Sequence, residues 1–193
     1  EIEPRAIDRE VSCALHMTHM GNTSTPEALI RQSLRNGLSD GWGGSMCGTE
    51  FSDVLFGTPK PIETEANLGV MNAENVNIVV HGHDPSLSEL ICEYADDPEM
   101  IAYAKSMGAK GITVSGVCCT SNEVAMRRGI PMAGNFLQQE NVVLTGACEA
   151  IVVDVQCIFP ALGPLSKCFH TKFITTSPIA SKTVNRILYI SRI

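Results

Sequence analysis

The chain lacks the marks of several large protein classes. No apolar run approaches the roughly 18 residues of a membrane-spanning helix, and residues 1–5 are charged and contain no signal-peptide core. The phosphate loop of nucleotide-binding proteins, the dinucleotide-binding glycine turn and the glycine–serine elbow of hydrolases are also missing. We therefore expect a cytoplasmic protein with no integral membrane segment, no nucleotide-phosphate loop and no serine nucleophile of that kind.

Cysteine is too sparse for a secreted disulfide scaffold. Eight cysteines in 193 residues make up about 4% of the chain, whereas disulfide-rich secreted domains exceed roughly 8%. We expect free thiols that serve burial, metal binding or catalysis. Hydrophobic residues make up 44% and charged residues 18%, as in a packed globular chain of one domain or two small ones.

Acidic residues are absent after Asp154. Residues 1–154 carry a net charge of −12 and the last 39 residues carry +5, for a total of −7. Neutralising nucleic-acid phosphates requires clustered Lys and Arg, which the acidic part lacks and the last 39 residues supply too sparsely. We expect no nucleic-acid partner.

A helical pattern in the first part of the chain is followed by an alternating strand–helix pattern. Residues 1–57 favour a helical segment, and residues 58–75 favour a connector. Residues 76–180 alternate short β-branched runs with helical stretches, which predicts a parallel α/β sheet with right-handed crossovers. Residues 181–193 form a divergent tail. The expected helices cover 6–20, 26–38, 46–56, 85–108 with a restart near 98, 121–128 and 140–147, and the expected strands cover 77–80, 112–117, 150–155 and 172–175.

Metal-capable side chains follow three of the expected strands. His83, Cys119 and Cys157 stand just beyond a strand each, at spacings of 36 and 38 residues. The carboxyl ends of parallel strands meet at one edge of the sheet, so the pattern predicts that these side chains converge on a metal site. His81 is the alternative to His83 for the histidine role.

The type of metal stays open at this point. No Cys-x-x-Cys pair occurs, which argues against a structural zinc site, and three ligands leave any closed site incomplete. Iron–sulfur clusters are rich in cysteine ligands, accept occasional histidine, and draw their ligands from widely separated positions.

Local turn signals refine this outline. The glycine-rich segment 40–45 predicts a tight, irregular backbone. Asp84 precedes a proline, which predicts a helix N-cap there. Thr120 and Glu123 have the spacing of a capping box, which would place Cys119 just before a helix. Because a helix N-terminus lowers a thiol pKa, we expect Cys119 to favour the thiolate.

Seven longer motifs occur in order along the chain. They are DGWGGS at 40–45, LFGTP at 55–59, ANLGV at 66–70, VHGH at 80–83, GVCCT at 116–120, RGIP at 128–131 and VDVQC at 153–157. Together they closely resemble anaerobic nickel–iron carbon monoxide dehydrogenase, and the match runs from about residue 6 to about residue 180.

The resemblance implies a helical segment followed by a Rossmann-like three-layer α/β domain with a mostly parallel sheet. It implies oxidation of CO with water to CO2, protons and electrons, or the reverse, at a nickel–iron–sulfur centre called the C-cluster. Electrons would leave through [4Fe-4S] clusters to a ferredoxin-like acceptor, in a homodimer. His83 and Cys119 resemble ligands of the iron outside the cubane, Cys157 resembles a ligand of another iron, and Asp40 matches an acidic residue near the active site.

The sequence also departs from the family pattern. The family has three further C-cluster cysteines in a second Rossmann-like domain, which these residues do not contain. The first residue is not Met, and the match ends near residue 180, so we expect a partial chain. Three interpretations stay open: part of the enzyme that supplies about half of the cluster ligands, a truncated inactive α/β domain without a cluster, or a hybrid-cluster, hydroxylamine reductase-like relative.

Overall fold

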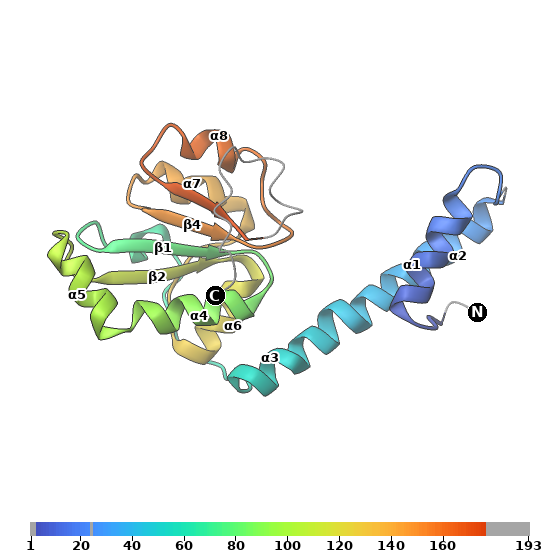
Figure 1. The fold of residues 1–193 in the computed structure, drawn as a ribbon, viewed down its shortest axis with the longest axis horizontal. Coiled ribbons are helices and arrows are strands. Elements are labelled where there is room, and N and C mark those ends of the chain that lie inside the picture. The colour runs from blue at the N-terminus through green and yellow to red at the C-terminus, as the bar shows by residue number, and fades with distance from the viewer. Residues whose placement is uncertain (1–2, 24, 177–193) are drawn as a thin grey trace. The chain divides into compact units, whose positions relative to one another are not determined.

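The computed structural model describes residues 3–23 and 25–176, so the expected tail at 181–193 lies outside the described residues. The chain divides into two compact units, Glu1–Gly57 and Thr58–Ile193. Helices make up the first unit, and a sheet with helices makes up the second (Figure 1).

The helical unit contains one long, uninterrupted helical path. After α1 (Ile7–Thr18), the chain runs through α2 (Pro26–Asp40), a π-helix at Gly41–Cys47 and α3 (Gly48–Phe56). The segment 40–45, predicted to have a tight, irregular backbone, departs from the regular α-helix only as a π-helix and stays within the continuous helical path. The physical reason lies in packing: a Cβ atom at Gly43 would collide with the side chain of Ile7, so the absence of a side chain lets α1 approach the continuing helix.

A buried carboxylate ties α1 to α2. Glu10 has no exposed surface, and its side chain accepts hydrogen bonds from Arg5 Nε at 2.8 Å and from Gln32 Nε2 on α2 at 2.7 Å. The hydrogen bonds from Arg5 lower the pKa of Glu10 from 4.5 to about 2. The ionised carboxylate is thus the form that the folded helical unit favours.

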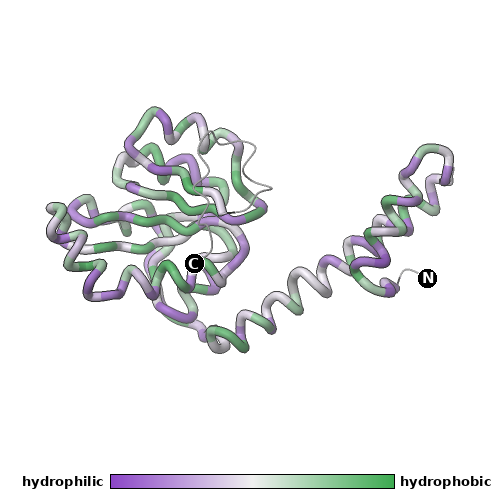
Figure 2. Tube along the Cα trace, in the orientation of Figure 1, coloured by the Kyte–Doolittle hydropathy of each residue, from purple (hydrophilic) through white to green (hydrophobic). Residues whose placement is uncertain are grey.

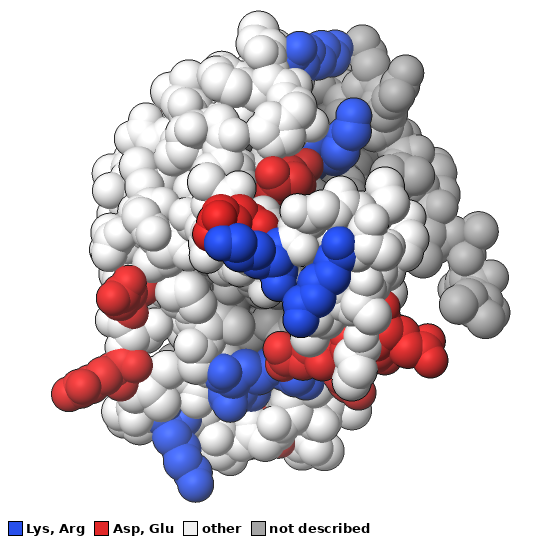
Figure 3. Space-filling view, turned by 90° about the vertical axis from the view of Figure 1, so that its left-hand side faces the viewer, with Lys and Arg blue, Asp and Glu red and all other residues white. Residues whose placement is uncertain are grey.

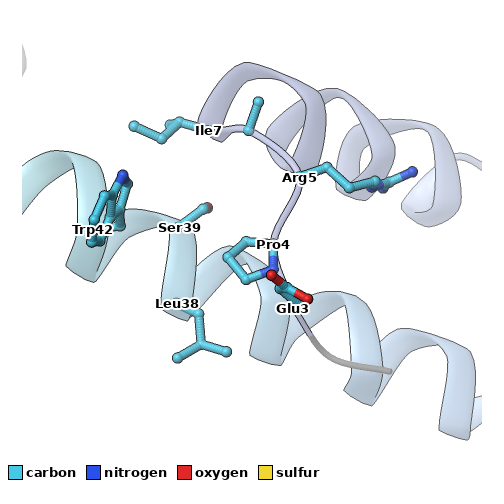
Figure 4. A pocket seen from close by; sticks show the side chains of 8 residues that line it. Glu3, Pro4, Arg5, Ile7, Leu38, Ser39 and Trp42 are labelled. Carbon is cyan, nitrogen blue, oxygen red and sulfur yellow. The ribbon is translucent and has the colours of Figure 1, made fainter.

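A cavity of about 430 Å³ lies in the helical unit, between the start of α1 and the end of α2 (Figure 4). It is lined by Glu3, Pro4, Arg5, Ala6, Ile7, Leu38, Ser39 and Trp42. The lining contains no histidine or cysteine, so this cavity offers no soft metal ligand.

The second unit is built on a five-stranded, fully parallel sheet with the strand order β3-β2-β1-β4-β5. The strands are β1 (Val76–His81), β2 (Ile112–Val117), β3 (Met132–Gly134), β4 (Ala150–Val153) and β5 (Lys172–Thr175). This is the strand order of a Rossmann-like sheet. The predicted fold class, a three-layer α/β domain with a mostly parallel sheet after a helical segment, is confirmed.

Helices cover both faces of the sheet. The helices are α4 (Pro85–Ala95), α5 (Pro98–Ser106), α6 (Cys118–Arg128), α7 (Gln139–Leu144) and α8 (Leu162–Ser166), with short 3-10 turns at Leu68–Val70 and Phe136–Gln138. One core cluster joins Val79 and Ile151 to Val142 of α7 and Leu162 of α8. A second, on the other face, joins strand residues to α4 and α6. Hydrophobic residues accordingly concentrate along the strands (Figure 2).

The predicted connector 58–75 is docked along the edge strand β3. Met132 N donates to Glu65 O at 2.8 Å and Asn67 N donates to Met132 O at 3.0 Å, with a parallel bridge between Ala66 and Met132. These bonds satisfy backbone groups at an edge that would otherwise be open to pairing with another chain. Neither β3 nor α8 was expected from the sequence.

The surface carries charges of both signs. Figure 3 shows Lys and Arg side chains interspersed with Asp and Glu on one face, with no continuous basic area there. Within residues 3–23 and 25–176, no helix combines the length and the hydropathy that crossing a membrane requires.

The Glu10 network leads to a test by pH. Because its folded-state pKa is lowered, Glu10 contributes stability that is fully present above about pH 4.5 and is lost as pH falls towards about 2. We expect the urea midpoint of the helical unit, followed by the fluorescence of the single tryptophan, Trp42, to fall across this window. Glu10→Gln should remove that part of the pH dependence. The exposed Glu27→Gln is the matched control, and an identical loss of pH dependence in both variants would contradict the assignment.

Candidate metal centre

Open parallel α/β sheets bind ligands in a crevice at the switch point of their strand order, and here that point lies at the carboxyl ends of β1 and β4. The chain proceeds from β1 to β2 and β3 on one side, then crosses back to β4 on the other. His83 follows β1, Cys119 lies beyond β2 and Cys157 lies beyond β4. The three predicted ligands therefore stand on turns at the same edge of the sheet.

Asp154 holds two of these turns together. Its buried carboxylate, directly after β4, accepts hydrogen bonds from His83 N at 2.6 Å, from Asp84 N at 2.7 Å and from the amide of Val155. Burial raises the pKa of Asp154, and the three amide bonds act in the opposite direction. Gly82 leaves room for this carboxylate, because a Cβ atom there would collide with it.

His83 is oriented as a metal-binding histidine would be. Its Nδ1 atom lies 3.1 Å from Val155 O, so Nδ1 carries the hydrogen and Nε2 presents a lone pair. Nε2 lies 4.0 Å from the thiol sulfur of Cys157. A backbone carbonyl bound to the second ring nitrogen is the usual support of a metal-ligating histidine.

His81 has a different environment. It is 1% exposed, and its Nε2 atom lies 2.8 Å from Gln139 Oε1. Burial lowers the pKa of His81, which favours the neutral ring. Of the two histidines, His83 is the one whose ring faces a cysteine in the crevice.

Three expectations for the turn after β2 are wrong. Helix α6 starts at Cys118, so Cys119 lies within its first turn, and Thr120 forms no capping box because its hydroxyl bonds Ser88 Oγ at 2.6 Å. The expected thiolate character of Cys119 is wrong as well, because burial raises the pKa of its thiol and the neighbouring Cys157, Glu123 and Asp154 add to the rise, although the residue as a whole is exposed. By contrast, the expected N-cap is confirmed, since Asp84 accepts a hydrogen bond from Ser86 N at 2.9 Å.

Unusual backbone conformations gather at this edge. Among the described residues, the non-glycine residues with positive φ are Cys118 at 71°, Gln156 at 61° and Cys157 at 54°. Such conformations are uncommon outside glycine and persist where surrounding contacts enforce them, often at functional sites. Burial also raises the pKa of the Cys118 thiol to about 12, and the neighbouring thiol of Cys157 adds to the rise.

The described residues do not form a complete metal site. No group of three or more His, Cys, Asp or Glu side chains in the described part of the chain is arranged so that it could hold a metal ion. The structure places His83 Nε2 4.0 Å from Cys157 Sγ, and Cys119 lies in the first turn of α6, after the neighbouring strand β2. Asp40, by contrast, is an exposed residue at the end of α2, in the helical unit.

Sequence reasoning missed two residues that shape the crevice. Asp154 had a signal, because it is a lone acid at the end of an apolar strand, within the motif that ends at Cys157. Gln139 had none, because a glutamine in a helix gives no indication of distant partners.

The contact between Gly82 and Asp154 leads to a stability test. We expect Gly82→Ala to lower the free energy of unfolding by about 1–3 kcal/mol more than Gly108→Ala, because it adds a collision with the carboxylate. Gly108 is the matched control: its φ is +100°, but no atom lies within 4 Å of a Cβ atom built there.

Urea unfolding measures both variants. In the double variant Gly82→Ala/Asp154→Ala the collision is gone, so its destabilisation should be smaller than the sum of the single effects. Strict additivity would contradict the packing of Asp154 against Gly82.

Comparison with known proteins agrees with this architecture. The chain is 57% identical over 179 residues to carbon monoxide dehydrogenase 1 of Methanosarcina mazei, covering 93% of this chain and 28% of that protein. A nickel-free crystal structure of carbon monoxide dehydrogenase from Thermococcus sp. AM4 matches with a TM-score of 0.86 and 56% identity, covering 92% of this chain and 28% of that one.

A structure of acetyl-CoA synthase/carbon monoxide dehydrogenase, described with NiZn[Fe4S4] and NiNi[Fe4S4] clusters, matches with a TM-score of 0.88 and 44% identity. The match covers 97% of this chain and 28% of the chain in that structure. The chain thus spans a little over a quarter of the length of these relatives. The sequence profile of the Prismane/CO dehydrogenase family matches residues 1–191. The resemblance in the motifs is confirmed: the chain belongs to the Prismane/CO dehydrogenase family.

Proposed function

We propose that this chain supplies about half of the ligands of the nickel–iron–sulfur cluster of a carbon monoxide dehydrogenase, which oxidises CO with water to CO2. The observation that carries the proposal is the pair His83 Nε2 and Cys157 Sγ, 4.0 Å apart, with the opposite ring nitrogen of His83 bonded to a carbonyl. The family membership supports carbon monoxide dehydrogenase chemistry in particular, and both residues lie in motifs that resemble this enzyme.

The donor set fits a cluster of this kind as a part of its ligands. Imidazole and thiolate are ligands that nickel, iron and iron–sulfur clusters accept. Cys119 would be the third ligand, on the turn that is bonded to the His83 turn through Thr120 N and Gly82 O at 3.0 Å. The remaining ligands would come from residues outside this chain.

When bound, the cluster supplies the metal centres at which CO and water react and electrons are collected. The chain's own residues hold the donors. The Nδ1 atom of His83 faces the Val155 carbonyl and Nε2 faces Cys157, and Asp154 fixes the backbone that carries the ring. Cys119 and Cys157 would lose their protons on metal binding, so loading would release protons and strengthen as pH rises.

Further elements of the proposal concern the whole enzyme. Asp40 would be the acidic residue near the reaction site. A homodimer would carry [4Fe-4S] clusters that pass electrons to a ferredoxin-like acceptor. These roles rest on the resemblance of the motifs, and the alternative is an inactive α/β domain that binds no cluster.

Anaerobic reconstitution with ferrous iron, sulfide and nickel tests the proposal. We expect the chain to retain iron, and Cys119→Ala and Cys157→Ala to weaken retention by about tenfold or more, because each removes a donor. CO-dependent dye reduction should be absent from the chain alone, because its donor set is incomplete.

Cys168→Ala is the matched control, since Cys168 is also an exposed free thiol but precedes β5 at the opposite edge of the sheet. Equal iron contents in Cys119→Ala, Cys157→Ala and Cys168→Ala would contradict the proposed ligands. Full CO-dependent activity of the isolated chain would contradict the incomplete donor set.

A further inference from the structure

Gln139 is a completely buried amide beside the candidate metal centre. It is the first residue of α7 and has 0% exposure. Its Nε2 atom donates to Phe136 O at 2.6 Å and to Cys157 O at 2.9 Å. Its Oε1 atom accepts from Phe159 N at 2.8 Å and lies 2.8 Å from His81 Nε2. All four hydrogen-bonding positions of the amide are therefore used.

The backbone partners fix the orientation of this amide. A carbonyl oxygen can only accept and an amide N–H can only donate, so Nε2 must face Phe136 O and Cys157 O, and Oε1 must face Phe159 N. It follows that His81 donates from Nε2. His81 thus holds Gln139 from the end of β1, and the Gln139 amide cannot rotate without leaving a buried polar atom unpaired.

The two backbone groups that Gln139 binds lie in the turn that carries the candidate ligand. The bond to Cys157 O holds the ligand residue itself, and the bond to Phe159 N holds the chain two residues later. The turn contains the left-handed residues Gln156 and Cys157, a conformation that needs enforcement from its surroundings. Gln139 provides contacts of that kind.

This arrangement bears on the direction of the thiol. Cys157 is itself exposed, its thiol is hydrogen-bonded to the side chain of the buried Cys118, and its sulfur lies 4.0 Å from His83 Nε2. Asp154 holds the His83 side of the pair, and Gln139 holds the Cys157 side. The two donors are thus supported by separate buried polar groups.

We propose that Gln139, locked by His81, is a positioning residue that aims Cys157 at His83 and so sets the affinity of the crevice for a thiophilic divalent cation. The inference rests on the proposed function, because it deepens the role of the same site.

Cobalt(II) alone, added to the reduced, metal-free chain under anaerobic conditions, is the probe. The signal is the thiolate-to-cobalt absorption that Cys157→Ala removes. We expect Gln139→Met, which keeps the length but has no amide, to weaken cobalt binding 10–100-fold, as loss of a ligand's support typically does. Gln139→Glu should weaken it at least as much at neutral pH, because a carboxylate oxygen would then face the carbonyl of Cys157.

Val143→Ala is the matched control, because Val143 is equally buried on the same helix and has no polar contact with the turn. It should lower stability and leave the cobalt affinity within twofold. Unchanged affinity in Gln139→Met, an equal loss in Val143→Ala, or no Cys157-dependent absorption in the unsubstituted chain would each overturn the proposal.

Hydrogen exchange of the unsubstituted chain gives a second measurement that needs no variant. The Phe159 amide lies outside every helix and strand, yet we expect it to exchange at least tenfold more slowly than the amide of the exposed Gln156. Equal rates would overturn the proposal even if the Gln139 variants fail to fold. If the chain binds cobalt with these properties but retains no iron on reconstitution, the proposed iron–sulfur cluster ligands would be contradicted. The positioning role of Gln139 would still hold.

Discussion

The carboxylate of Asp154 is the contact on which the crevice depends. The turns after β1 and β4 are far apart in sequence, and the sheet alone brings only their strands side by side. Asp154 joins the turns themselves, because one buried side chain accepts the amides of His83, Asp84 and Val155. Val155 in turn offers its carbonyl to the ring of His83. The position and the tautomer of the candidate ligand therefore follow from one anchored turn, which Gly82 makes sterically possible.

The fold was predictable where its causes are local. The β-branched run at 112–117 and the aspartate–proline pair before α4 specify a strand and a helix start through short-range preferences, and both are confirmed. The strand β3 spans three residues, and beside its pairing with β2 it is bonded to Glu65 and Asn67, more than sixty residues earlier. The glycine-rich π-helix depends likewise on α1 packing against Gly43. No local pattern contains such partners.

In the candidate site too, the sequence predicts the features with local causes and misses those that depend on distant contacts. The spacing of His83, Cys119 and Cys157 follows from the length of a strand–helix unit, so the sequence could place them at one edge of the sheet. The pKa of Cys119 could not be predicted from its place at a helix start, because burial and the neighbouring negative groups outweigh the helix terminus. The supports from Asp154 and Gln139 act across 71 and 18 residues, through hydrogen bonds that only the folded chain forms.

The groups that hold His83 and Cys157 in place are separate from the two proposed ligand atoms, and this bears on the proposed metal binding. These groups are backbone amides and carbonyls, a buried carboxylate and a buried amide, and none of them is a proposed metal ligand. In the proposed role the pair is therefore arranged by the fold, and the ordering of its turns would belong to folding rather than to metal binding. In the proposed role, a chain with a little over a quarter of the length of its relatives would hold its share of a donor set in place, and the number of donors, rather than their order, would limit what it binds.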